Sequence, residues 1–197
     1  MRDNNLLKVK QTGLTLIELM VSIVVLAVLL AAAAPSFNDF FVKGRLRGAA
    51  DSVSSLLSKA RAEAGRSDRD VTAVLRTNAN NWCIGARQRT QATAGISSAA
   101  GSETCDCLAT PNQCVVGNQV VLVSAADFSD ITISASNNAN FQFDRKLGVL
   151  SNLAAGSMTL STASDRFQLR VEVAPSGYPR VCVPAGKPQF GGFDTCA

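Results

Sequence analysis

The order of polar and apolar residues divides the chain into three parts. A polar, basic stretch ends at Gly13, and residues 14–34 are then largely apolar but contain one carboxylate, Glu18. A helix rises about 1.5 Å per residue, so about 20 apolar residues span the hydrocarbon core of a bilayer. The pattern therefore predicts a membrane-spanning helix, and the positive residues of the leader would stay on the cytoplasmic side.

A second helical pattern follows Pro35. Apolar residues recur there at steps of three and four, as on one face of an amphipathic helix. They are Leu46, Ala49, Ala50, Val53, Leu56, Leu57, Ala60 and Ala64. Pro35 removes a helical hydrogen bond and should kink or end the first segment, and Gly65 is the expected C-cap. We predict one long helix from about residue 14 to about residue 64, whose second half docks on a globular domain.

The rest of the chain has a β pattern. Short runs of β-forming residues are separated by Asn, Gly, Ser and Pro, which is typical of strands and turns. The expected strands are 71–75, 82–84, 119–123, 131–133, 141–143, 148–150, 158–160, 168–173 and 180–183. Residues 141–150 predict a hairpin with its turn at 144–148, and 87–113 predict a long loop. The fold class is therefore α+β, with a long N-terminal helix packed on antiparallel β-sheets.

Composition and charge argue against an enzyme. The 197 residues include no histidine, which excludes a Ser/His/Asp triad and His-ligated metal sites. The formal net charge is +4, of which the leader supplies +2, so the remainder does not by itself indicate nucleic acid. The acid pairs Asp68/Asp70 and Asp127/Asp130 lie at expected turns and are interpreted as caps and turn residues, not as an acid/base pair. We predict no catalytic residue and no cofactor.

Six cysteines follow the helix. They are Cys83, Cys105, Cys107, Cys114, Cys182 and Cys196. Their spacing lacks the paired C-x-x-C of a zinc ribbon, so disulfides in an oxidising compartment are preferred to a metal site. We expect Cys182 to pair with Cys196 and the other four to form two bridges across the middle loop. Cys105 and Cys107 should not pair with each other, because so small a ring is strained.

The position of Gly13 carries a processing signal. A secretory signal peptide is cut after its apolar core, whereas Gly13 precedes the apolar run. Residues 13–18, Gly-Leu-Thr-Leu-Ile-Glu, resemble the cleavage and methylation motif of type IV prepilins and type II secretion pseudopilins. In that family a membrane peptidase cuts after the glycine and methylates the new N-terminus, here Leu14 where Phe is usual. Pro35 also matches a proline common in the pilin helix.

Later segments extend this resemblance. Residues 56–74 are similar to the helix end and first strand of the FimT/GspH group of minor pilins and pseudopilins, and 141–144 and 177–182 are similar to later strands. The resemblance implies a type IV pilin-like fold with three parts. They are a leader 1–13 cleaved after Gly13, a hydrophobic transmembrane and filament-core helix 14–41, and a periplasmic globular head 42–197.

Glu18 has two interpretations. A carboxylate at the centre of a membrane segment costs about 2.5–3.5 kcal/mol or more. The resemblance implies that Glu18 pairs with the free amine of Leu14 of a neighbouring subunit, which would compensate the charge inside a filament. Alternatively, Glu18 merely reaches the membrane interface. The motif favours pairing, so Leu14, Glu18 and Pro35 are the expected assembly residues.

DNA binding is an alternative that the same resemblance raises. FimT members in natural transformation carry a glycine- and arginine-containing C-terminal motif that binds DNA. The corresponding tail here offers only Arg180 and Lys187, which departs from the two-arginine pattern. Arg87 and Arg89 would extend a phosphate site if the middle loop lies nearby. Ordinary solvated surface is the preferred interpretation of these residues.

The function that this sequence favours is that of a minor type IV pilin, which helps to prime and cap pilus assembly for twitching motility or adhesion. Its partners would be other minor pilins, the major pilin, the prepilin peptidase and the inner-membrane assembly platform. It would cross the bacterial inner membrane once, with its head in the periplasm, and then reach the pilus tip. A GspH-type minor pseudopilin of type II secretion and a DNA-binding minor pilin are the alternatives.

Overall fold

The computed structural model describes residue 13 and residues 15–78, 81–89, 105–135 and 140–196, without the side chains of 32–36. These residues form two compact units that divide after Phe40. Each unit is described by itself. Helix α1, Leu16–Ser67, contributes residues to both units.

The first unit is the N-terminal part of α1. The Thr15 hydroxyl accepts a hydrogen bond from the Glu18 N–H at 3.3 Å, as an N-cap side chain does. The large apolar side chains from Leu16 to Leu30 are 52–76% exposed. The helix continues through Pro35, so the alternative that it ends there is wrong. Among the described residues, no helix combines the length and hydropathy of a membrane span.

The second unit contains the strands, all paired antiparallel. The described residues form sheets with the orders β5-β2-β1-β7, β10-β9-β8-β6 and β3-β4. The bounds are β1 Val71–Asn78, β2 Asn81–Gln88, β3 Val115–Val116, β4 Gln119–Val120, β5 Leu122–Ser124, β6 Ile131–Ala135, β7 Asn140–Phe143, β8 Gly156–Thr162, β9 Gln168–Val173, β10 Pro179–Cys182 and the 3-10 turn η2 Pro111–Gln113. The α+β class is confirmed.

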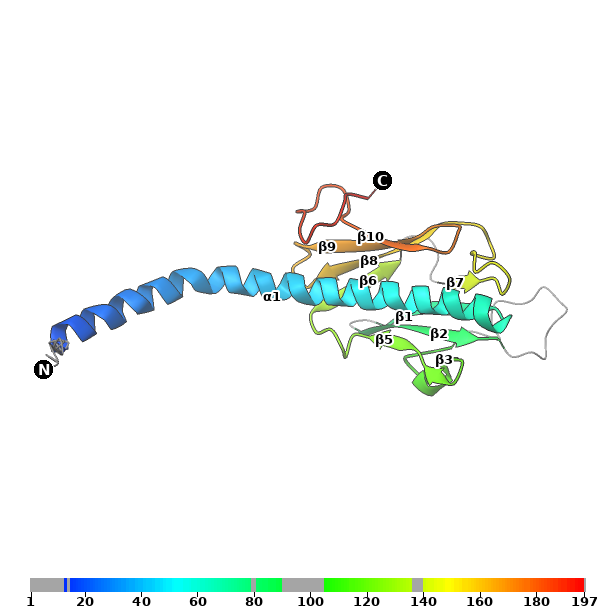
Figure 1. Cartoon of the computed structure of the whole chain (residues 1–197), viewed down its shortest axis with the longest axis horizontal. Helices are drawn as coiled ribbons and strands as arrows, with labels where there is room; N and C mark the ends of the chain where they lie inside the picture. Colours follow the sequence, from blue (N-terminus) through cyan, green and yellow to red (C-terminus); the bar gives the residue numbers. More distant parts are fainter. Residues whose placement is uncertain (1–12, 14, 79–80, 90–104, 136–139, 197) are drawn as a thin grey trace, which may run out of the picture. The chain divides into compact units, whose positions relative to one another are not determined.

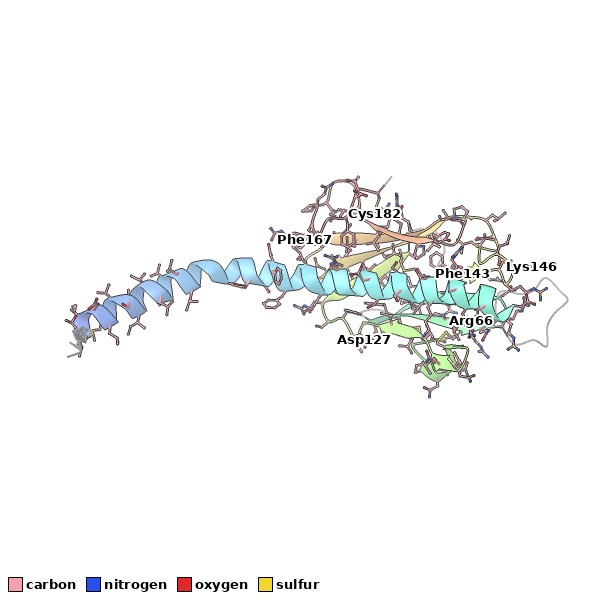
Figure 2. The ribbon with its side chains drawn as sticks, in the orientation of Figure 1. Arg66, Asp127, Phe143, Lys146, Phe167 and Cys182 are labelled. Atoms are coloured by element: carbon pink, nitrogen blue, oxygen red, sulfur yellow. A yellow bond between two sulfur atoms is a disulfide. The ribbon has the colours of Figure 1, made fainter. Side chains whose placement is uncertain are left out.

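The buried face of α1 is the one that its spacing predicts. All eight residues of the stripe from Leu46 to Ala64 are at most 3% exposed. They join one apolar cluster with residues of both four-stranded sheets. The cluster includes Phe143 of β7 and Phe167, which directly precedes β9; both are buried (Figure 2). Figure 1 shows the second half of α1 crossing both sheets. On β8 and β9 burial alternates residue by residue, as expected when one sheet face covers a core.

Trp82 links the two larger sheets. This side chain is 2% exposed, and its indole N–H donates a hydrogen bond of 2.7 Å to the carbonyl of Ile131. Trp82 belongs to β2 and Ile131 to β6, which lie in different sheets. A buried N–H without a partner is costly, so this bond favours one relative placement of the sheets.

Three local predictions need correction. Gly65 lies inside α1, which ends at Ser67, and Asp68 then takes a φ of 50°; aspartate tolerates this region better than most residues. Residues 148–150 make only an isolated bridge to Phe143, because the Leu150 N–H bonds to the Pro175 carbonyl. Arg87 and Gln88 belong to β2 and not to the loop, and 90–104 lie outside the described residues.

Three disulfides join the six cysteines. The pairs are Cys83–Cys107, Cys105–Cys114 and Cys182–Cys196. The last pair is the one that the sequence favoured, and Cys105 and Cys107 bond to different partners. A disulfide sulfur is not the thiolate that zinc binds, so the structure supports bridges and not a metal site. Each bridge stabilises the fold by about 2–4 kcal/mol.

Four of these cysteines form a small second core on β2. Side chains alternate along a strand, so Trp82, Ile84 and Ala86 face the main core while Cys83 and Gly85 face the opposite side. The four sulfurs of Cys83, Cys105, Cys107 and Cys114 are buried together there. A Cβ on Gly85 would lie 2.5 Å from the Cys114 Sγ, so only glycine allows the loop this close approach.

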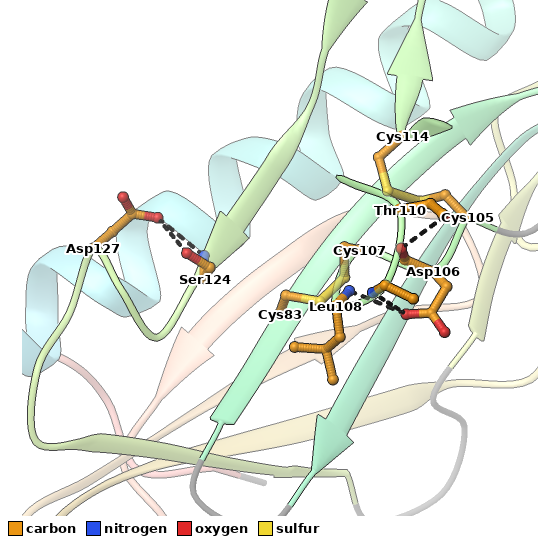
Figure 3. Close-up of a disulfide and its surroundings, with 10 residues drawn as sticks. Cys83, Cys105, Asp106, Cys107, Leu108, Thr110, Cys114, Ser124 and Asp127 are labelled. Carbon is orange, nitrogen blue, oxygen red and sulfur yellow. Dashed lines mark hydrogen bonds between the residues drawn. A yellow bond between two sulfur atoms is a disulfide. The ribbon is translucent and has the colours of Figure 1, made fainter. Parts of the chain in front are cut away.

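Side-chain oxygens fix the turns around this cluster (Figure 3). The Asp106 Oδ1 accepts hydrogen bonds from the N–H groups of Leu108 and Ala109, at 3.0 and 3.1 Å. The Asp127 Oδ2 accepts bonds from the N–H and hydroxyl of Ser124. Such turns are typical of aspartate. They support the interpretation of Asp127 as a turn residue.

Replacing Trp82 by Phe should lower the free energy of unfolding by about 1–3 kcal/mol, because the buried Ile131 carbonyl loses its indole donor. Urea unfolding of the full chain, followed by far-UV circular dichroism, measures the change. Tyr178→Phe is the matched control, since Tyr178 is 61% exposed, and it should shift stability by less than about 0.5 kcal/mol. Equal stability of Trp82→Phe and the wild type would show that the bond does not join the sheets.

Replacing Gly85 by Ala should destabilise the protein by about 1–3 kcal/mol, because the new methyl group collides with the disulfides. Gly65→Ala is the control: a Cβ there meets nothing within 4 Å, and alanine in a helix interior should stabilise by up to about 1 kcal/mol. Thermal unfolding of both variants compares the two sites. An unchanged melting temperature for Gly85→Ala would contradict the close packing.

Candidate functional site

The N-terminal motif is described in part. Gly13 and Glu18 are exposed, whereas Leu14 and the side chain of Pro35 lie outside the described residues. Glu18 lies in the first turn of α1, among the exposed apolar side chains. This stretch therefore presents a helical surface that is almost wholly apolar and carries one carboxylate. Such a surface packs against other apolar helices or lipid, and the carboxylate then needs a cationic partner.

The tail cations that were candidates for DNA contact are both paired with acids. The Arg180 guanidinium lies 3.1 Å from the Glu172 carboxylate. The Lys187 ammonium lies 3.0 Å from the Asp165 carboxylate and also bonds to its backbone carbonyl. Hydrogen bonds from Gln168 and then from Lys187 lower the pKa of Asp165, so this acid stays ionised at neutral pH.

The tail itself is well held by the head. The disulfide joins Cys182 to Cys196, and Val183 exchanges backbone hydrogen bonds with residues 194 and 196. Phe190 packs edge-on against Phe167, with ring centroids 5.6 Å apart. The segment therefore lies against the main core and is not a free arm.

Arg87 and Arg89, the other two candidates, lie apart from the strand of Arg180. Arg87 belongs to the end of β2 and Arg89 follows directly after that strand. Their side chains lie on the same side, because they are two residues apart. They line a cavity of about 340 Å³. Its walls are Arg69, Arg87, Gln88, Arg89, Gln113, Val115 and Gly117. The described lining thus contains three guanidinium groups and no carboxylate.

Arg69 was missed by sequence reasoning. It lies just before β1, and the register pairs Val71 with Gln88. The backbone N–H of Arg89 continues that register, because it donates a hydrogen bond of 2.8 Å to the Asp70 carbonyl. This pairing brings Arg69 beside the end of β2. The signal was present as arginines before the expected strand 71–75 and after the expected strand 82–84, but only the pairing register shows that these two ends meet.

Comparison with known proteins identifies the family. The model of the prokaryotic N-terminal methylation motif matches residues 8–34, and the model of type II transport protein GspH matches residues 49–177. No curated protein matches the chain. Two crystal structures of the type IV minor pilin FimU of Pseudomonas aeruginosa PAO1 are similar, with TM-scores of 0.45 and 0.44 and 14% identity. They cover 69% and 73% of this chain and 91% of each FimU chain. Because the GspH model spans more than half of it, the chain belongs to the GspH family of pilins and pseudopilins and carries their N-terminal methylation motif.

Proposed function

We propose that the protein is a minor type IV pilin that helps to prime and cap pilus assembly. The observation that carries the proposal is the exposed apolar surface of α1 with Glu18 in its first turn. This surface lies within the matched methylation motif, which covers residues 8–34. A soluble protein rarely leaves so large an apolar surface in water. The role lies in packing between subunits and not in catalysis.

The N-terminal part would serve in two environments in turn. The peptidase removes residues 1–13 after Gly13, and residues 14–41 anchor the protein in the inner membrane. The apolar run 14–34 has about the length that a bilayer needs. The same helix later enters the filament core, while residues 42–197 form the periplasmic head. The methylation motif supports this membrane anchor, because proteins of that family are anchored pilins.

Glu18 would set the position of the subunit in the filament. Its carboxylate is exposed in the isolated chain and becomes surrounded by apolar helices after assembly. A charge in such surroundings is stable only when it is paired. The proposed partner is the free amine of Leu14 of the neighbouring subunit, and Pro35 completes the set of assembly residues.

The head suits an exposed position at a filament tip. Its disulfides tie down the loop 105–114 and the tail that ends at Cys196, which supports a rigid surface for capping. Other minor pilins, the major pilin and the inner-membrane assembly platform are the partners that this role requires. After assembly the protein would lie at the pilus tip on the cell surface.

Two alternatives remain. The matched family model is named for type II transport, and a minor pseudopilin would use the same motif and helix. DNA uptake is less well supported, because Arg180 and Lys187 are engaged with Glu172 and Asp165. These ion pairs reduce the positive charge that a phosphate backbone would meet.

Deletion of the gene should strongly reduce surface pili and twitching and should leave secretion of type II substrates unchanged. Electron microscopy counts the pili, and immunoblotting of the culture medium measures secretion. Complementation with the wild-type gene is the control, and it should restore both pili and twitching. A secretion defect with normal pili would assign the protein to the pseudopilus instead.

Gly13→Trp should leave an uncleaved precursor that does not assemble, because the peptidase site is blocked.

Glu18→Gln should be cleaved normally but should be at least about tenfold depleted from sheared pili, since an uncharged side chain cannot form an ion pair with the amine. Mass spectrometry of the N-terminus and immunoblots of sheared filaments separate the two effects. Glu18→Asp, which keeps the charge, is the control and should assemble better than Glu18→Gln. Wild-type amounts of Glu18→Gln in pili would contradict the pairing.

A further inference from the structure

The arginine-lined cavity combines positive charge with a recessed shape. Arg87 comes from the end of β2, Arg89 follows directly after it, and Arg69 comes from the segment before β1. All three residues are of intermediate burial, so each is partly removed from solvent. Charges held in a partly buried recess act on a ligand more strongly than charges on an open surface.

Only one of these three charges has an acid beside it among the described residues. The Asp70 carboxylate lies 3.3 Å from the Arg89 guanidinium. It also accepts a hydrogen bond of 3.0 Å from the backbone N–H of Arg145. In the described part of the chain, Arg69 and Arg87 form no ion pair and no side-chain hydrogen bond. Two guanidinium groups are thus available to a ligand, next to one that is held in place.

The acids near the cavity do not cancel this charge. Glu63 is engaged by Arg66 through two hydrogen bonds of 2.8 and 2.9 Å, at the last turn of α1 (Figure 2). Asp68 is exposed at the end of the helix and is not part of the lining.

The walls of the cavity are fixed before any ligand arrives. The Gln88 side chain accepts the Gly117 N–H at 3.0 Å and donates to the Ser67 hydroxyl, which joins the β3-β4 turn to β2 and to the end of α1. Gln113 precedes Cys114, whose disulfide holds the opposite wall. A preformed site loses little conformational entropy on binding.

These observations favour a single oxyanion over a polynucleotide. Guanidinium groups bind carboxylate and phosphate through paired N–H donors. A volume of about 340 Å³ corresponds to about eleven waters at about 30 Å³ each, so it has room for one acidic side chain together with several waters. A nucleic acid instead carries regularly spaced phosphates along its outside, which a row of cations on an open surface would match better than one recess.

We propose that this cavity binds an acidic side chain of a neighbouring subunit, so that Arg69 and Arg87 form the recognition pair and Arg89 supports them. The choice of a subunit as the source of the carboxylate rests on the proposed assembly function. The binding chemistry does not, because the cavity can be tested apart from any filament. Recognition of this kind would select the neighbour by its charge and fix its orientation.

The test uses the mature full chain in a non-ionic detergent at low salt and at 0.15 M salt. Isothermal titration calorimetry compares the peptide acetyl-Gly-Glu-Gly-Glu-Gly-amide with its Gln counterpart, inorganic phosphate and a single-stranded oligonucleotide of about 12 nucleotides. The Glu peptide should bind at least about tenfold more tightly than the Gln peptide, with an affinity that falls as salt rises.

Variants then locate the binding. Arg69→Gln and Arg87→Gln should each weaken binding of the Glu peptide by about tenfold or more. Arg87→Lys, which keeps the charge but loses the planar fork, should fall between wild type and Arg87→Gln. Arg180→Gln makes the same change on the other sheet and should leave the affinity unchanged. Circular dichroism of every variant verifies that the fold is kept.

Several results would overturn the proposal. One is that the Glu peptide does not bind. Another is that it binds but Arg69→Gln and Arg87→Gln do not alter its affinity. A third is that phosphate binds and the Glu peptide does not. Oligonucleotide binding that exceeds peptide binding and is lost in the same variants would reassign the cavity to nucleic acid. Because this measurement requires no pilus, its failure is separate from a failure of the assembly role in cells.

Discussion

The fold depends on the burial of one face of α1 against both four-stranded sheets. The stripe from Leu46 to Ala64 is almost fully buried, and small residues within it let the helix approach the strands closely. Burial of each large apolar side chain contributes about 1.5–3 kcal/mol, so this contact contributes substantially to the stability of the head. The Trp82 bond between the sheets and the turns capped by aspartate then select one arrangement around that helix.

The outer face of β2 is covered by disulfides and not by the helix, because α1 covers only the inner face. There the two disulfides of Cys83, Cys105, Cys107 and Cys114 form a compact cluster against Gly85. The cluster holds η2 and the β3-β4 turn in place, and these segments carry Gln113 and Gly117 of the arginine-lined cavity. Structural cross-links thus hold the walls of the cavity, which suits the recognition role that we propose for it.

The two parts of α1 serve opposite purposes with one continuous helix. The second half buries its apolar face against the sheets of the same chain, whereas the first half leaves large apolar side chains exposed. The isolated chain is therefore incomplete in a physical sense, and burial in a membrane or among other helices would complete it. In the proposed filament, the buried charge of Glu18 would also require a cationic partner.

The sequence by itself determined the features that depend on short-range spacing. The helical period placed the stripe from Leu46 to Ala64, and cysteine spacing indicated that Cys182 pairs with Cys196. Residues 13–18 identified the processing motif. Only the tertiary structure decided the features that depend on strand register, because a register brings together residues that are distant along the chain. It placed Arg69 beside Arg87, paired Arg180 with Glu172, and pressed two disulfides onto Gly85. The helix end also differs from the expected one, although it is a local feature: Gly65 is compatible with a cap, but α1 continues to Ser67 and Asp68 makes the turn.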